Sequence, residues 1–185
     1  DGRFLVVTNR FSNFASVIDT NSDEVVKEIA IPWYSIDVVF SPDGKRAYFT
    51  NRWKDRVLFW DLEVGSSFRV TGDNYGGVRP EDPVGIPVAD NPRDLAIAPD
   101  GSRLFVASGT GVSLGIIDTE QAREISRVNL ASPPGDVVVN QSFVLVTHTG
   151  RGSQHRPDEG YDTDGDGLPD GTEVLYVAMG CFWGV

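Results

Sequence analysis

The fold is decided by the stretch Ser41-Pro42-Asp43-Gly44-Lys45-Arg46-Ala47-Tyr48-Phe49-Thr50-Asn51, which joins a tight turn to a run of aromatic and apolar residues. Pro42 fixes φ at the first corner of the turn, and Gly44 accepts the positive φ that the turn requires. Full copies of the Asp-Gly turn and its run begin at Asp1 and Asp100, and a degenerate copy begins at Asn140. Self-similarity of this kind predicts a repeat architecture.

Each copy is accompanied by further apolar runs. One follows it and ends in aspartate, and another precedes it and begins with aspartate. The runs that follow are Val17-Ile18-Asp19, Leu58-Phe59-Trp60-Asp61 and Ile116-Ile117-Asp118, and those that precede are Asp37-Val38-Val39, Asp94-Leu95-Ala96 and Asp136-Val137-Val138. A mixed polar run at 24–31 and at 123–130 is typical of an outer edge strand. The composition of the runs predicts strands, and we expect Trp60 to be a core residue.

The spacing of the copies indicates a β-propeller. Gly44 follows Gly2 by 42 residues, and Gly101 follows Gly44 by 57 because of an insertion at 71–92. Four strands per roughly 42 residues is the period of a propeller blade. We therefore predict an all-β partial β-propeller of about three to three and a half four-stranded blades over residues 1–149.

The repeats resemble the YVTN type of bacterial β-propeller. Val7-Thr8-Asn9 and Phe49-Thr50-Asn51 match the signature, whereas the third and fourth copies depart from it with Val106-Ala107-Ser108 and Val146-Thr147-His148. The resemblance implies an extracytoplasmic protein of bacteria, with rings mostly of seven blades. A closed ring needs at least four blades, so we expect the chain to be a piece of a longer one that holds the missing blades or domains. A small twisted stack, complete in itself, is the alternative.

One end of this propeller segment is a candidate binding face. The loops after the second strand of a blade and the loops between blades emerge at the same end, and there they carry aromatic and basic residues. The candidate contacts for an anionic or peptide-like ligand, or for a partner protein, are Trp33, Tyr34, Arg52 and Trp53. The alternative is that these aromatic side chains only fold back over the blade rim.

Composition excludes two classes of partner. The net charge of −11 disfavours nucleic acid, whose phosphates require clustered cations. The longest apolar runs have about six residues, whereas a membrane-spanning helix needs about 20.

The acidic segment at 150–173 reads as a calcium-binding linker. Residues 162–173 match every ligand position of the 12-residue calcium loop, and Gly167 allows its sharp turn. The predicted calcium ligands are Asp162, Asp164, Asp166, the Leu168 carbonyl, Asp170 and Glu173. The flanks lack the helices of an EF-hand, and the loop resembles those of thrombospondin type 3 repeats. A merely solvated acidic linker is the alternative.

The final residues, 174–185, resemble the start of an A-class peptide-methionine sulfoxide reductase, whose active-site motif is matched by Gly180-Cys181-Phe182-Trp183-Gly184. The resemblance implies that Cys181 is the nucleophile toward a methionine sulfoxide, and that Phe182 and Trp183 form the pocket for its methyl group. The family's other catalytic residues have no counterpart here, so we expect this chain alone to be inactive. An inert buried thiol in a C-terminal strand is the alternative.

Three classes of function remain open at this point. The chain is a binding or scaffold module, a piece of an extracytoplasmic enzyme that repairs oxidised methionine, or a part of a structural surface or matrix protein.

Overall fold

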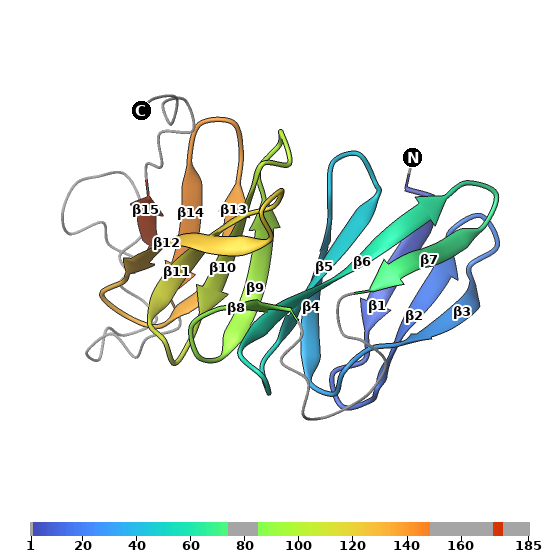
Figure 1. The fold of residues 1–185 in the computed structure, drawn as a ribbon, viewed down its shortest axis with the longest axis horizontal. Helices are drawn as coiled ribbons and strands as arrows, with labels where there is room; N and C mark the ends of the chain where they lie inside the picture. Colours follow the sequence, from blue (N-terminus) through green and yellow to red (C-terminus); the bar gives the residue numbers. More distant parts are fainter. Residues whose placement is uncertain (1, 74–84, 149–171, 176–185) are drawn as a thin grey trace, which may run out of the picture.

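The computed structural model describes residues 2–73, 85–148 and 172–175, and these form four antiparallel β-sheets (Figure 1). Within each sheet the main strands follow one another in chain order, as an up-and-down meander, and the short β8 of the second sheet pairs with β6 outside this order. The described residues contain no helix long and apolar enough to cross a membrane.

The first and last sheets have three strands each, and the two middle sheets have the four strands of a complete blade. The first holds β1 (Phe4–Thr8), β2 (Phe14–Asp19) and β3 (Glu24–Ala30). The second holds β4 (Ser35–Phe40), β5 (Arg46–Asn51), β6 (Arg56–Val64) and β7 (Phe68–Asp73), with the short β8 (Ile86–Pro87) added to β6. The third holds β9 (Pro92–Ile97), β10 (Arg103–Ser108), β11 (Ser113–Asp118) and β12 (Arg123–Asn129). The fourth holds β13 (Pro134–Val139), β14 (Val144–His148) and β15 (Thr172–Leu175).

The sheets stand side by side in chain order, from β1–β3 at one side of the view to β13–β15 at the other (Figure 1). Successive residues of a strand face opposite sides of the sheet, and therefore opposite neighbouring sheets. Phe49 packs in the apolar layer against the first sheet, whereas Tyr48 packs in the layer against the third. Leu104 and Phe105 divide in the same way between the layers on either side of the third sheet. The predicted fold class, an all-β partial propeller, is confirmed.

Burial follows the position of a strand within its blade. The second strands β5 and β10 are almost wholly buried, and Trp60 on β6 is fully enclosed, as predicted. The outer strands β3 and β12 are mostly exposed, which agrees with their mixed polar sequences.

The fourth sheet ends differently from the sequence expectation. Its third strand, β15, pairs with β14 so that Glu173 lies opposite Val146 and Val174 opposite Leu145. The boundary that the sequence placed between residues 173 and 174 therefore falls inside a strand of the propeller segment.

The inner edges of consecutive sheets are joined by aspartates of the first strands. The Asp37 carboxylate on β4 accepts a hydrogen bond from the Leu95 amide on β9 at 2.8 Å. One unit later, the Asp94 carboxylate accepts one from the Val137 amide on β13 at 2.6 Å. These contacts, which we call inner-edge staples, satisfy backbone amides that antiparallel pairing within the sheet leaves free.

The Asp94 carboxyl group keeps its proton to a higher pH than an ordinary aspartate does. Burial is the main reason that the pKa of Asp94 is raised, to about 7. Two other causes raise it further: the charge of Asp37 together with a hydrogen bond between the two carboxyl groups, and the charge of Asp136. The Val137 amide acts in the opposite direction. The folded state therefore holds a proton that the unfolded chain releases near pH 3.8. Stability from this group is complete below pH 4 and is lost as the pH rises to about 7.

We predict that Asp94→Asn removes this loss. An asparagine keeps an acceptor for the Val137 amide and donates to Asp37 without a proton to lose. The variant should match the parent chain at pH 4 and exceed its unfolding free energy at pH 8 by up to roughly 2 kcal/mol, since solvent screening reduces the effect for a group that is not fully buried. Urea unfolding at both pH values measures the difference. The control is Asp90→Asn, at an exposed aspartate; equal pH slopes for Asp94→Asn and the parent chain would contradict the prediction.

Candidate ligand-binding face

Four aromatic rings from three loops form a continuous row at one end of the first two sheets. Phe11 comes from the β1–β2 turn, Trp33 and Tyr34 from the link between β3 and β4, and Trp53 from the β5–β6 turn. Ring centroids are 5.9 Å apart between Phe11 and Tyr34, 5.1 Å between Tyr34 and Trp33, and 5.3 Å between Trp33 and Trp53. Tyr34 and Trp33 are stacked, and Trp53 meets Trp33 edge-on.

Two arginines lie over the middle of this row. The guanidinium carbons of Arg10 and Arg52 are 5.3 Å and 5.2 Å from the centre of the Tyr34 ring, and Arg10 is also 5.0 Å from the ring of Phe11. A guanidinium at such a distance from a ring centre is attracted by the ring's electrons. We call the set Arg10, Phe11, Trp33, Tyr34, Arg52 and Trp53 the aromatic–arginine cluster.

Local backbone geometry places an arginine and an aromatic residue at the tip of each of two turns. The Ser12 amide donates to the Asn9 carbonyl at 2.8 Å, which closes a β-turn with Arg10 and Phe11 at its centre. The Lys54 amide donates to Oδ1 of Asn51 at 2.9 Å, and this side-chain cap leaves Arg52 and Trp53 at the tip.

Asn51 ties the turn to the neighbouring loop. Its buried side chain donates from Nδ2 to the Trp33 carbonyl at 2.9 Å, and the Arg52 amide donates to the Tyr34 carbonyl at 3.2 Å. Tyr34 has φ of 69°, a left-handed conformation that is strained for a bulky residue. This conformation is held by both of these hydrogen bonds from the β5–β6 side.

The cluster is a cationic surface on an anionic protein. Arg10 Nη2 donates to the Tyr34 hydroxyl at 3.1 Å, and this bond is the main reason that the pKa of Tyr34 lies below its usual value, followed by the charges of Arg52 and Arg10. Within the described ranges neither arginine has an ion pair with a carboxylate. The Nε of Arg52 is buried without a hydrogen-bond acceptor from the described residues.

The rings are available to solvent. The exposed fractions are 70% for Phe11, 64% for Trp53 and 43% for Trp33. The corresponding β10–β11 turn of the third unit has Gly109-Thr110-Gly111 instead, and the link at 130–133 has no aromatic residue. The repeat therefore folds without such rings, and the cluster is an addition to two of its units.

The structure thus brings together all four contact residues that the sequence suggested, Trp33, Tyr34, Arg52 and Trp53. Their role in binding stays a prediction. The sequence analysis did not select Arg10 and Phe11, although Asn9-Arg10-Phe11 and Asn51-Arg52-Trp53 occupy the same place in the repeat. That shared pattern was the available signal.

The other predicted site residues lie almost wholly outside the described residues. Among the calcium ligands only Glu173 is described, as part of the backbone of β15. The remaining ligands, Asp162, Asp164, Asp166, Leu168 and Asp170, and the reductase motif residues Cys181, Phe182 and Trp183, lie in 149–171 and 176–185. No group of three potential metal-ligating side chains is found in the described parts of the chain.

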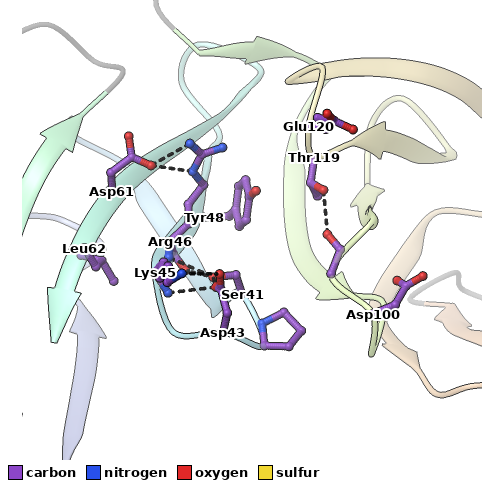
Figure 2. Close-up of a pocket in the computed structure, with 12 residues that line it drawn as sticks. Ser41, Asp43, Lys45, Arg46, Tyr48, Asp61, Leu62, Asp100, Thr119 and Glu120 are labelled. Atoms are coloured by element: carbon purple, nitrogen blue, oxygen red, sulfur yellow. Dashed lines mark hydrogen bonds and ion pairs between the residues drawn. The ribbon is translucent and has the colours of Figure 1, made fainter.

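A hollow of about 590 Å³ lies at the opposite end, between the second and third sheets. Figure 2 shows Arg46, Tyr48 and Asp61 on one side of it and Asp100, Thr119 and Glu120 on the other. Polar groups that line the hollow are bound to one another: Arg46 forms an ion pair with Asp61 at 2.7 Å, and the Thr119 hydroxyl donates to the Gly101 carbonyl at 2.6 Å. This hollow therefore offers a ligand fewer unsatisfied groups than the aromatic–arginine cluster does.

No protein-family model and no curated protein match this sequence. Solved structures do. Hydrazine synthase of Kuenenia stuttgartiensis is similar with a TM-score of 0.66 and 21% identity, over 83% of this chain and 41% of that one. The β-propeller domain of Cps50 (Swd1) from Myceliophteria thermophila has a TM-score of 0.63 and 9% identity, over 96% of this chain and 51% of that one. Dihydro-heme d1 dehydrogenase NirN has a TM-score of 0.58 and 19% identity, over 95% and 35%.

At such identities the likeness shows the fold alone, which is that of a β-propeller. The chain spans about half or less of the length of these structures.

Proposed function

We propose that this chain is a binding segment of a larger extracytoplasmic β-propeller protein, and that the aromatic–arginine cluster binds an anionic, peptide-like ligand. The observation that carries the proposal is the confinement of the cluster to two units. The third unit builds the equivalent β10–β11 turn from glycine and threonine, so the repeat folds without the exposed rings and the arginines beside them.

The chemistry of the cluster favours a carboxylate attached to an apolar body. A guanidinium presents donors in a fork that matches a carboxylate, and Arg10 and Arg52 place two guanidinium groups over the Tyr34 ring. The faces of Phe11, Trp33 and Trp53 offer apolar contact beside it. A cationic ligand would be repelled by the two guanidinium groups.

An acidic peptide with aromatic side chains is the probe that tests this proposal. We expect isothermal titration of N-acetyl-Phe-Asp-Phe-Glu into the chain to give saturable binding that weakens with salt. Arg52→Ala should weaken it about tenfold or more, because a hydrogen bond to a charged group contributes roughly 1.5–3 kcal/mol. Trp53→Ala should weaken it by removing ring contact.

Two controls accompany the titration. Arg123→Ala removes an arginine from the exposed outer strand β12 and should leave affinity unchanged. The peptide with Asn and Gln in place of Asp and Glu should bind much more weakly. Equal loss from Arg52→Ala and Arg123→Ala would mean that only net charge matters, and would refute a site at the cluster.

We further propose that residues 162–173 bind one calcium ion and stiffen the segment between β14 and β15. The support is the spacing of the carboxylates, each at a ligand position of the calcium loop. Glu173, the bidentate ligand of that pattern, lies on β15 opposite Val146 of β14. An ion held by Glu173 would therefore be attached to the propeller segment.

Calcium titration of the full chain tests the loop. We expect one site with a Kd of roughly 10⁻⁴ to 10⁻³ M, as in extracellular modules, and slower proteolysis near Gly160 with calcium bound. Glu173→Gln should abolish the site, whereas Asp158→Asn, in the same acidic stretch but outside the loop, should preserve it. Equal effects of the two substitutions would indicate diffuse attraction instead of a site.

The reductase alternative rests on Gly180-Cys181-Phe182-Trp183-Gly184 alone, and the comparisons lend it no support. It remains a prediction about a longer parent chain, as does the role in a surface or matrix protein.

A further inference from the structure

The inner-edge staples repeat with a fixed rule. In each case the aspartate is the third residue of a first strand, and its carboxylate binds the amide of the residue that follows the equivalent aspartate one unit later. Asp37 binds the amide after Asp94, and Asp94 binds the amide after Asp136. Asp136 is the next member of this series.

Asp136 has the same local setting as Asp37. The Asp136 amide donates to the Thr147 hydroxyl at 2.9 Å, as the Asp37 amide donates to the Thr50 hydroxyl at 3.1 Å. The carboxylate of Asp136, however, is exposed, and no donor from the described residues reaches it. Asp136 is therefore positioned to form a third inner-edge staple, and among the described residues its carboxylate has no backbone amide to bind.

The apolar surface beside Asp136 is uncovered as well. Val138 is 57% exposed, whereas Ala96, its equivalent in the third unit, is 7% exposed because the fourth sheet packs on it. Leu145 is only half-buried, and its equivalent Phe105 is fully buried in the same layer. This face of the fourth sheet has the composition of an inner layer without the sheet that would complete it.

We infer that the face formed by Asp136, Val138 and Leu145 docks the first strand of a further repeat unit, with the Asp136 carboxylate accepting the hydrogen bond of that strand's backbone amide. The inference rests on the proposed membership of a larger propeller. The similar propellers are about twice as long as this chain or longer, which leaves room for such units.

A second copy of this chain fits the face less well. In the described part of the chain, the other apolar sheet face left uncovered is that of the first sheet, where Leu5 is 50% exposed. Among the described residues that sheet begins with β1, which corresponds to the second strands β5 and β10. It therefore has no first strand to present an amide to Asp136.

The test uses a labelled synthetic peptide with the sequence of residues 92–108, which are the two inner strands of the chain's own third unit. Fluorescence anisotropy with the full chain should show saturable, one-site binding. Asp136→Ala should weaken it at least tenfold, and Asp136→Asn, which keeps an acceptor, should weaken it much less. Because Asp136 is exposed, both variants should melt as the parent chain does.

A matched pair of peptides isolates the hydrogen bond. N-methylation of the amide at the Leu95 position should abolish binding, whereas N-methylation at the Ile97 position, on the same edge of the strand two residues later, should preserve most of it. Absence of binding, or equal loss with both peptides, would overturn the inference.

Two further measurements separate this inference from its alternatives. The first measurement is the molar mass of the chain by light scattering. If the chain forms a stable dimer, and if Leu5→Lys and Val138→Lys each dissociate it, the face binds a second copy and the inference is overturned. Asp136→Ala should leave binding of the acidic peptide to the aromatic–arginine cluster unchanged, so failure here and failure of the proposed ligand site are distinguishable.

Discussion

Each sheet of this chain is apolar on both faces, and this constraint determines the rest of the structure. Tyr48 and Phe49 are adjacent on β5, yet they enter different apolar layers, one shared with the third sheet and one with the first. A sheet of this kind cannot stand alone in water, because covering one face leaves the other exposed. Stacking in chain order satisfies the middle sheets, and the meander then places every turn at one of two ends. The scaffold is rigid, and its variable turns are free to carry chemistry.

The staples add direction to this stacking. Apolar layers tolerate sliding of one sheet on another, whereas a carboxylate that binds one particular backbone amide allows a single register. The contact between Asp37 and the Leu95 amide joins the inner edges of two sheets without any side-chain partner on the second. Specificity of this kind costs stability at neutral and higher pH. Asp94 is buried beside a second carboxyl group, which raises its pKa and makes its ionisation in the folded state unfavourable.

Local sequence patterns predicted the strands, the turns and the burial of Trp60, because alternation, composition and the Asp-Gly turns are all set within a few residues. Long-range contacts were beyond such patterns. The staple between Asp37 and Leu95 joins residues 58 positions apart, and nothing near Asp37 indicates it. The ion pairs between Arg46 and Asp61 and between Arg103 and Asp118 were readable as repeated positions, but their pairing depends on strand register. For the candidate site, the sequence placed the right loops, with Arg10 and Phe11 among them, at one end. It did not name Arg10 and Phe11 as contacts, because only the Tyr34 ring links them to the rest.

The aromatic–arginine cluster straddles the joint between two sheets. Phe11 is carried by the first sheet and Trp53 by the second. The link between the sheets carries Tyr34, whose ring contacts Phe11, and Trp33, whose ring contacts both Tyr34 and Trp53. A small change in the tilt of one blade against the next would part these rings or press them together. A bound molecule that spans the row would therefore hold the angle between these two sheets fixed, and a change in that angle would in turn change the affinity for the molecule.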